Sequence, residues 1–436
     1  MQPRVLIVGT VPYNQKSTSR AFDAYFHYWA KENLRQVFSN TKKPCKGHCS
    51  SLFQITDQRM LKRWFNKKIE TGIIYNYDDL DVEWKSNDIE LDSKVAKMGY
   101  SIGSKHTPLT HLIRGIIWRK KFWCTKKLDK WLDSFKPDVV FLAFSDDYFI
   151  NNIALYVAEK YGIPIVSCIG DDYYFNKHFS LNIFYQIYKE SYKQLIRKVF
   201  KHNGSAIYIS DKIRDKYNQE FSLDGETVYL TSNVIRKNFS VINKENPVIT
   251  YFGNIRMGRN ESLCAIANVL KKINEKYVLE VYSNELNSKY YKIFKKYSNI
   301  NFCGSVPYEQ VKKRMSESDI TVIVEGFKNK DIELSRYSLS TKAADALSSG
   351  SAILVYGSKE CGVIEYMAKT NAALVSDNKE ELFNKLKVLL DSPSLQKKYY
   401  EQAKEVCETN HNLKRSCGVS AEVINKAILR GKYEKK

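Results

Sequence analysis

The sequence has no hydrophobic segment long enough to cross a membrane, and it is poor in acidic residues. None of its apolar stretches reaches the ~18 uninterrupted residues that a membrane-spanning helix needs. Asp and Glu together number 48 against 69 Lys and Arg, which gives a formal net charge of +21. Such a charge predicts a partner with an anionic surface: the phosphates of a small molecule, nucleic acid or lipid headgroups.

Signals for secretion and for disulfide bonding are also lacking. The first residues contain no basic segment followed by a long apolar run and a small-residue cleavage site, and residues 4–8 have the composition of a strand. The nine cysteines are odd in number and scattered through 436 residues, which predicts reduced thiols. We therefore expect a cytoplasmic protein.

Metal-ligating residues do not gather in the sequence. Cys45, His48 and Cys49 have suitable side chains, but no second cluster supplies the rest of a tetrahedral site. We therefore expect no metal ion.

Short apolar segments rich in β-branched and aromatic residues recur at helix-length intervals, which predicts parallel sheets built from βαβ units. The pattern stops at the polar, proline-ended stretch 243–247 and then restarts. We predict an α/β protein with two Rossmann-like doubly wound domains, residues 1–242 and 248–415, facing an interdomain cleft, and a helix at 416–436 that could cross back to the first domain. The predicted strands are 5–8, 139–144, 165–169 and 206–209, then 248–252, 278–282, 300–303, 320–324, 352–356 and 372–375.

A glycine-containing turn follows the first strand of the second domain. Gly253 and Gly258 allow close approach of the backbone, and Arg256 and Arg259 offer guanidinium groups at the start of a helix. Guanidinium groups and free backbone N–H groups together bind phosphate well. The turn predicts a diphosphate site, although by itself it also fits an ordinary βα turn with surface arginines.

A second candidate site lies between Glu325, which ends a predicted strand, and a helix that stops at Gly350. Ser340 or Thr341 is a suitable N-cap for that helix. Lys342 adds a cation to the helix end that is already positive. Either this lysine is solvated, or an anion binds there.

These motifs, in their order and spacing, resemble the donor-binding half of a GT-B glycosyltransferase. The features are a basic residue six positions after a glycine, a Glu-Gly-aromatic triplet at a strand end, and an acidic residue five positions before a glycine. The sequence is similar to the retaining, family-4-like enzymes of bacterial capsule, O-antigen (lipopolysaccharide) and cell-wall polysaccharide synthesis. This resemblance implies transfer of a sugar from a UDP-, dTDP- or GDP-linked donor to a saccharide or lipid-linked acceptor, without a cofactor.

The resemblance also implies roles for basic and main-chain groups. Arg259 stands at the position of the family's phosphate-binding lysine. Asn254 stands where many members have an arginine, so Arg256 could substitute for it. Gly304, Ser305 and Val306 match the place where main-chain groups meet the nucleobase, and they complete an implied donor-binding set of Gly253, Asn254, Arg256, Arg259, Gly304, Ser305, Val306, Glu325, Ser340, Thr341, Lys342 and Asp345.

Two carboxylates take further roles by resemblance. Glu325 matches the group that contacts the donor sugar, and Asp345 the group that holds the ribose hydroxyls. Glu333 has the literal spacing from Glu325 of the family's paired-glutamate motif, but we prefer Asp345 because of its helix context. We expect Glu325, Arg259 and Lys342, together with Asp171, to be catalytic.

The acceptor-side candidates lie in the first domain. Gly9 and Thr10 follow its first strand, and the absence of two further glycines nearby argues against a nicotinamide-binding fingerprint. Asp171 and Asp172 follow a later strand and could hold an acceptor hydroxyl or serve as general base. Plain βα turns remain the alternative at both places.

Residues 112–136 combine eight basic and two acidic residues with five large aromatic ones. Rings at headgroup depth and cations near anionic lipid would hold the protein on the inner leaflet of a membrane. The alternative is a set of helices whose aromatic residues belong to the core. The aromatic residues concerned are Trp118, Phe122, Trp123, Trp131 and Phe135.

Two other functions stay open at this point. The charge and the 112–136 segment also fit a non-catalytic basic RNA-binding or membrane-adaptor protein on the same fold. A non-hydrolysing nucleotide-sugar epimerase would share the architecture. A glycosyltransferase is expected to bind no nucleic acid.

Overall fold

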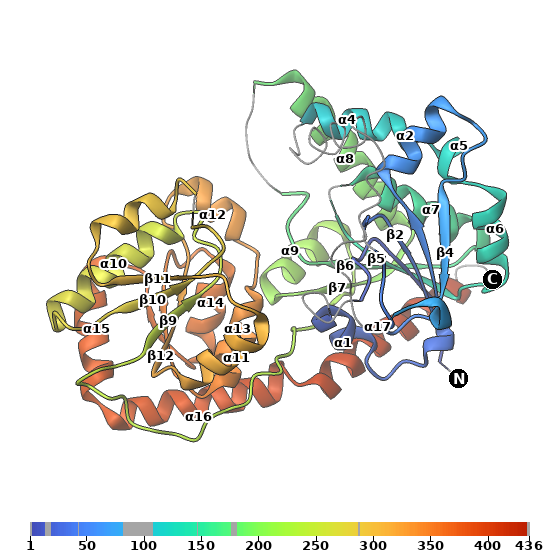
Figure 1. The fold of residues 1–436 in the computed structure, drawn as a ribbon. Coiled ribbons are helices and arrows are strands. Elements are labelled where there is room, and N and C mark those ends of the chain that lie inside the picture. The colour runs from blue at the N-terminus through green and yellow to red at the C-terminus, as the bar shows by residue number, and fades with distance from the viewer. Residues whose placement is uncertain are drawn as a thin grey trace. The chain divides into compact units, whose positions relative to one another are not determined.

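The computed structural model describes residues 2–13, 19–41, 43–81, 108–145, 147–175, 181–286 and 288–433. The chain divides into two compact units, Met1–Val228 with Cys417–Lys436, and Tyr229–Ser416. Each unit is a largely parallel sheet flanked by helices (Figure 1). The predicted α/β class with two Rossmann-like doubly wound sheets is confirmed.

The first unit contains eight strands in the order β4-β3-β2-β1-β5-β6-β7-β8. All neighbours pair in parallel except β3 and β4, which are antiparallel. The central strands are buried along their whole length because helices cover both faces of the sheet. The strands are β1 Val5–Val8, β2 Leu34–Phe38, β3 Ser51–Ile55, β4 Gly72–Asn76, β5 Val139–Ala143, β6 Ile165–Ile169, β7 Asn203–Tyr208 and β8 Glu226–Thr227.

The second unit contains six parallel strands in the order β11-β10-β9-β12-β13-β14. Its core has two parts, because alternate side chains of each strand point to opposite faces of the sheet. Tyr251 and Val322 pack with helices on one face, and Ile323 and Val355 with helices on the other. The strands are β9 Ile249–Phe252, β10 Leu279–Tyr282, β11 Ile300–Gly304, β12 Ile320–Val324, β13 Ala352–Tyr356 and β14 Leu374–Ser376.

Helices connect the strands in both units. Those of the first unit are α1 Ser19–Phe26, α2 Asp57–Phe65, α4 Pro108–Ile117, α5 Lys120–Trp123, α6 Lys126–Asp133, α7 Tyr148–Tyr161, α8 Ile183–Lys201, α9 Asp211–Phe221 and α17 Leu413–Tyr433, which begins in the second unit. Those of the second are α10 Arg259–Ile273, α11 Tyr308–Glu317, α12 Asn329–Ser335, α13 Thr341–Ser349, α14 Gly362–Thr370, α15 Lys379–Asp391 and α16 Pro393–Asn410. No helix in the described part of the chain is long and apolar enough to span a membrane.

The sequence did not predict strands β2, β3, β4 and β8. Polar residues interrupt two of them, yet these side chains are buried and hydrogen-bonded in the structure. Gln36 of β2 donates to the carbonyl of Thr10 at 2.6 Å, and Gln54 of β3 donates to that of Asn40 at 2.7 Å. Each bond gives the side-chain amide N–H group a partner inside the sheet.

The division between the units falls at Val228 and Tyr229 rather than at the predicted stretch 243–247. Residues 229–242 belong to the second unit because they are hydrogen-bonded to it. The backbone N–H of Lys237 donates to the carbonyl of Ser349, and that of Ile242 to the side chain of Gln396, both at 3.0 Å. Residues from Cys417 onward belong to the first unit.

Both sheets have a switch point at which the strand order reverses, between β1 and β5 in the first unit and between β9 and β12 in the second. At such a point the connections leave toward opposite faces, and a crevice opens at the carboxyl ends of the strands. Gly9 and Thr10 follow β1, the turn 253–258 follows β9, and Glu325 follows β12. The fold therefore positions these residues where ligands bind in doubly wound sheets.

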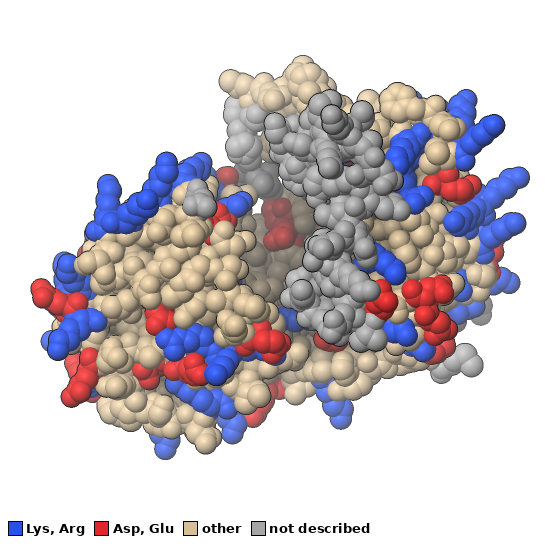
Figure 2. Space-filling view, in the orientation of Figure 1, with Lys and Arg blue, Asp and Glu red and all other residues tan. Residues whose placement is uncertain are grey.

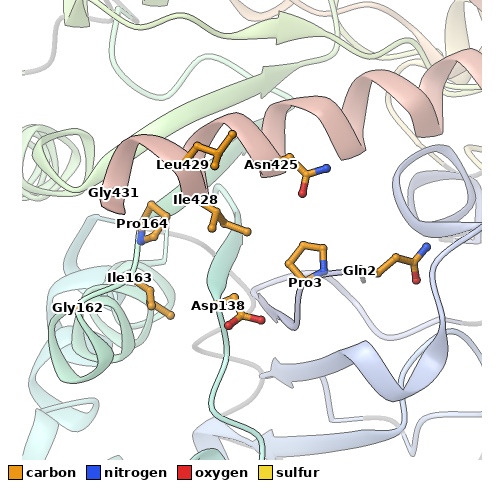
Figure 3. Close-up of a pocket in the computed structure, with 10 residues that line it drawn as sticks. All are labelled: Gln2, Pro3, Asp138, Gly162, Ile163, Pro164, Asn425, Ile428, Leu429 and Gly431. Atoms are coloured by element: carbon orange, nitrogen blue, oxygen red, sulfur yellow. The ribbon is translucent and has the colours of Figure 1, made fainter. Parts of the chain in front are cut away.

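A cavity of about 510 Å³ lies at the opposite, amino-terminal edge of the first sheet (Figure 3). It opens between α17 and the residues that precede β1, β5 and β6. Asp138 in its wall is already paired with Arg4 at 3.1 Å. The cavity thus offers no unmatched charge and lies away from the switch point.

Candidate active site

The turn after β9 is built around glycines with left-handed backbone. Gly253 has a φ of +142° and Gly258, the N-cap of α10, a φ of +73°. A Cβ atom on Gly253 would lie 2.2 Å from Cε and 2.3 Å from Nζ of Lys342. Glycine is therefore favoured at 253 by its backbone conformation, and a Cβ there would also displace the end of the Lys342 side chain.

Arg259 and Glu325, 66 residues apart in sequence, meet at the switch point. The guanidinium donates to both carboxylate oxygens, from Nε at 3.0 Å and from Nη2 at 2.8 Å. The Arg259 side chain is 11% exposed and the Glu325 side chain 4% exposed. Nη1 of Arg259 also donates to Asn254 at 2.7 Å. The structure thus brings two predicted donor-binding groups together as a buried, bidentate ion pair.

Lys342 brings a second cation to the same place. It lies in the first turn of α13, whose N-cap Ser340 accepts a hydrogen bond from the Lys342 backbone N–H at 3.4 Å. Burial, and the nearby positive charge of Arg259, lower the pKa of Lys342 to about 8, although Glu325 and Asp345 act in the opposite direction. No hydrogen bond from its ammonium to another described residue is seen.

Asp345 lies three residues further along α13 and is buried. Its Oδ1 accepts from the Ser232 hydroxyl at 2.5 Å and from the Tyr308 hydroxyl at 3.1 Å. No motif pointed to Ser232 or Tyr308, because hydroxyl residues this far away in sequence carry no recognisable spacing. Tyr308 begins α11, directly after the loop of Gly304, and so connects the predicted nucleobase loop to the predicted ribose carboxylate.

The loop after β11 leaves open space. Gly304 has a φ of +74°, and a Cβ built on it would meet no atom within 4 Å. Ser305 is exposed and Val306 half-buried. The glycine is required for backbone conformation, and main-chain groups beside it can approach a planar ligand.

Arg256 points elsewhere. Its Nε donates to the buried Glu285 at 2.6 Å. A pocket of about 320 Å³ opens beside it, between the start of α10 and α12. Glu333, which has the literal motif spacing from Glu325, lies in α12. The residues that line the pocket include Arg256, Met257, Gly258, Asn260, Glu261, Tyr290, Lys328, Lys330, Asp331 and Leu334.

In the first unit, Gly9 has a φ of +95° and lies against the end of β5 and the start of α7. A Cβ on it would lie 2.5 Å from Ile150 and 2.8 Å from the carbonyl oxygen of Ala143. Its role in the fold is therefore close packing of the backbone at the switch point. The carbonyl of Thr10 is held by the hydrogen bond from Gln36.

The two aspartates after β6 differ in role. Asp172 accepts hydrogen bonds from the backbone N–H groups of Tyr174 and Phe175 and from the hydroxyl of Tyr217, at 2.9–3.0 Å. It stabilises the turn. Asp171 has its side chain at the surface, where reduced hydration and the like charge of Asp172 raise its pKa. A carboxyl of raised pKa is the better proton acceptor of the two.

The aromatic residues of 112–136 are core residues, which corrects the prediction that they reach headgroup depth. Trp118 stacks on Phe149 with ring centroids 3.7 Å apart, and Trp131 donates to Ser51 at 2.9 Å. All five aromatic side chains are buried: Trp118, Phe122, Trp123, Trp131 and Phe135. Within the described ranges, no group of three or more His, Cys, Asp or Glu residues could hold a metal ion.

Residues 259–417 match the family model described as Glycosyl transferase-like. No curated protein matches the sequence.

Solved structures similar to the whole chain share its fold. HepE of Anabaena, solved in complex with UDP, has a TM-score of 0.58 and 11% identity, over 97% of this chain and 99% of that one. Sucrose-phosphate synthase of Thermosynechococcus elongatus has a TM-score of 0.57 and 10% identity, over 99% and 100%. A TarM variant of S. aureus, solved with fondaparinux, α-GlcNAc-glycerol and UDP, has a TM-score of 0.55 and 10% identity, over 98% and 100%. Residues 259–417 thus match a glycosyltransferase-like family model, and the chain as a whole shares the GT-B fold of these structures.

Proposed function

We propose that the second unit binds the diphosphate of a nucleotide-sugar donor between Gly253, Arg259 and Lys342. The observation that carries this proposal is the charge balance of the buried site. Glu325 is already engaged by Arg259, whereas Lys342 is held in the same protein interior at a lowered pKa. A partly buried ammonium that makes no hydrogen bond to another described residue is costly, and a phosphate group would supply it with an anionic partner.

The same groups suit the chemistry of glycosyl transfer. Negative charge grows on the leaving diphosphate as the glycosidic bond breaks, and cations already in position stabilise it. Glu325 would exchange its ion pair for contacts with the donor sugar. Asp345, oriented by Ser232 and Tyr308, would accept hydrogen bonds from the ribose hydroxyls.

For the acceptor side we propose a saccharide, carried on a lipid, in the synthesis of a surface polysaccharide at the cytoplasmic side of the membrane. Asp171 is the candidate to orient or deprotonate the acceptor hydroxyl. We further propose retention of anomeric configuration, in which the departing phosphate can itself take the proton of the acceptor. These steps follow from the family resemblance and the position of Asp171 at the carboxyl end of β6.

The test is a panel of nucleotide sugars, beginning with UDP-linked donors because HepE and TarM were solved with UDP. Donor turnover with sugar transfer, and a product anomer assigned by NMR, would support the proposal. Arg259→Ala is expected to lower turnover at least tenfold, whereas Lys276→Ala, at an exposed lysine of the same unit, should not change it. Equal turnover in both variants, or salt-sensitive RNA binding without any response to nucleoside diphosphates, would contradict it.

A further inference from the structure

The first unit carries an unusual helix, α4, which buries polar residues and exposes apolar ones. Thr110 and His111 are buried, and the His111 ring stacks on Tyr188 of α8 with centroids 4.8 Å apart. Leu109, Ile113 and Ile116 are each 44–46% exposed. Ile113 comes four residues after Leu109, and Ile116 three residues after Ile113, so the three side chains lie on one face of the helix. An amphipathic helix packed on a protein core normally shows the reverse arrangement.

The neighbouring helix α8 continues the same surface. Its buried residues all lie from Tyr192 onward, and none lies in its first two turns. Ile183, Phe184 and Ile187 in those turns are between 44% and 66% exposed. We call the six side chains of the two helices the apolar ridge: Leu109, Ile113, Ile116, Ile183, Phe184 and Ile187.

The ridge projects beyond the carboxyl edge of the first sheet. The Tyr192 hydroxyl is hydrogen-bonded to the carbonyl of Ser145, just after β5 ends, which fixes that part of α8 at the edge. The nine residue-to-residue steps from Ile183 to Tyr192 rise about 14 Å along the helix axis. The ridge therefore extends outward on the side of the sheet where Gly9 and Asp171 lie.

Positive charge surrounds this surface. The segments 57–70, 108–124 and 181–193, which contain α2, α4, α5 and the start of α8, hold eleven Lys and Arg but three Asp and Glu. Exposed Arg119, Lys120 and Lys121 directly follow α4, and Lys67 and Lys68 follow α2. Figure 1 shows α2, α4, α5 and α8 grouped together, and Figure 2 shows Lys and Arg gathered on the side of this group where α2 and α5 lie.

We propose that the apolar ridge and its flanking cations dock the first unit on an anionic lipid bilayer. Apolar side chains that protrude from a surface, with Lys and Arg around them, match the two layers of a membrane interface: acyl chains inside and anionic headgroups outside. A protein partner would instead call for fewer lysines around the apolar centre. Docking at this edge would bring the acceptor-side residues toward a saccharide carried on lipid.

The first experiment is co-sedimentation of the full chain with vesicles of phosphatidylcholine alone or with one quarter phosphatidylglycerol. We expect binding to the anionic vesicles, at least tenfold weaker after Ile113→Ser, Ile116→Ser, Ile183→Ser and Phe184→Ser together. The matched control combines Ile235→Ser and Val388→Ser, two exposed apolar residues of the second unit, and should bind like wild type. Lys120→Glu with Lys121→Glu leaves the ridge intact and should also weaken binding at least tenfold, since each lost cation is worth roughly fivefold.

The depth of insertion gives a second, independent readout. Ile183→Trp should gain tryptophan fluorescence that brominated lipids quench, over the wild-type signal. No binding of wild type to anionic vesicles, binding that ignores phosphatidylglycerol, or equal binding by the ridge and control variants would overturn the proposal. Vesicle binding is measured without a sugar donor, so its failure is distinguishable from failure of the proposed transfer reaction.

Discussion

Replacing Lys342 with methionine should stabilise the protein while weakening its binding of nucleoside diphosphates. Folding lowers the pKa of this lysine from 10.5 to about 8. Each pKa unit corresponds to about 1.4 kcal/mol, so keeping the ammonium charged inside the folded protein destabilises it by roughly 3 kcal/mol at pH 7. Methionine has a similar unbranched shape without the charge, and it removes this destabilisation.

The sign of the pH dependence follows from the same shift. Between pH 8 and 10.5 the lysine is protonated more often in the unfolded chain than in the folded one. The free energy of unfolding of the wild type therefore gains a positive contribution from this residue as the pH rises. The variant lacks it. The stability difference should be full at pH 7 and should shrink as the pH approaches 10.

Calorimetry of the full chain can measure both effects. For a unit of this size each kcal/mol shifts the melting temperature by about 2–4 °C, so the variant should melt up to roughly 6–12 °C higher at pH 7. UDP should raise the melting temperature of wild type, less so above pH 8, and should scarcely raise that of the variant. The control is Lys276→Met, at an exposed lysine of the same unit. A variant less stable than wild type at pH 7, with the control unchanged, would refute the reasoning.

Three further substitutions test the rest of the site. Glu325→Gln should slow sugar transfer at least tenfold. UDP should nevertheless raise the melting temperature of this variant more than that of wild type, because Arg259 has lost its carboxylate partner and a phosphate can take its place. Equal shifts of the two melting temperatures in calorimetry would count against this. Gly253→Ala should cost more than 1 kcal/mol of stability in urea unfolding and displace Lys342, since its Cβ has no room; an unchanged unfolding midpoint would argue otherwise. Asp171→Asn should lower turnover in a steady-state assay while leaving the UDP dissociation constant within twofold, and a matching loss of UDP binding would speak against an acceptor-side role.

Much of the candidate site could be predicted from the sequence, because the ends of buried strands can be recognised from where runs of β-branched residues stop. Glu325 closes an unbroken run of five β-branched residues, and Gly253 follows a strand of similar kind. In a doubly wound sheet such ends share one edge, so proximity of the two followed from fold class alone. The ion pair between Arg259 and Glu325 could not be predicted in this way. A motif indicates which residues bind a ligand, but not which residues they contact when the ligand is absent.

Other features depend on which face of a helix meets the core, and composition does not reveal that. Residues 112–136 carry both aromatic and basic residues, a pattern that fits a membrane surface and a core helix equally. The structure buries Trp118 and Trp131 and exposes Ile113 and Ile116. The exposure of the two isoleucines could not be predicted from the sequence, because the apolar face of a helix ordinarily packs against the protein core.

The arrangement of charge in the second unit joins the fold to the chemistry. The strand order places Arg259 and Glu325 side by side, and the start of α13 adds Lys342 against the bare backbone of Gly253. Burial and the neighbouring charge of Arg259 oppose the charge on Lys342 more strongly than Glu325 and Asp345 favour it, as the lowered pKa of Lys342 records. A bound diphosphate would remove that opposition, and its growing negative charge during bond cleavage would be stabilised further. In the proposed reaction, the feature that destabilises the folded chain would thus be the one that favours departure of the leaving group.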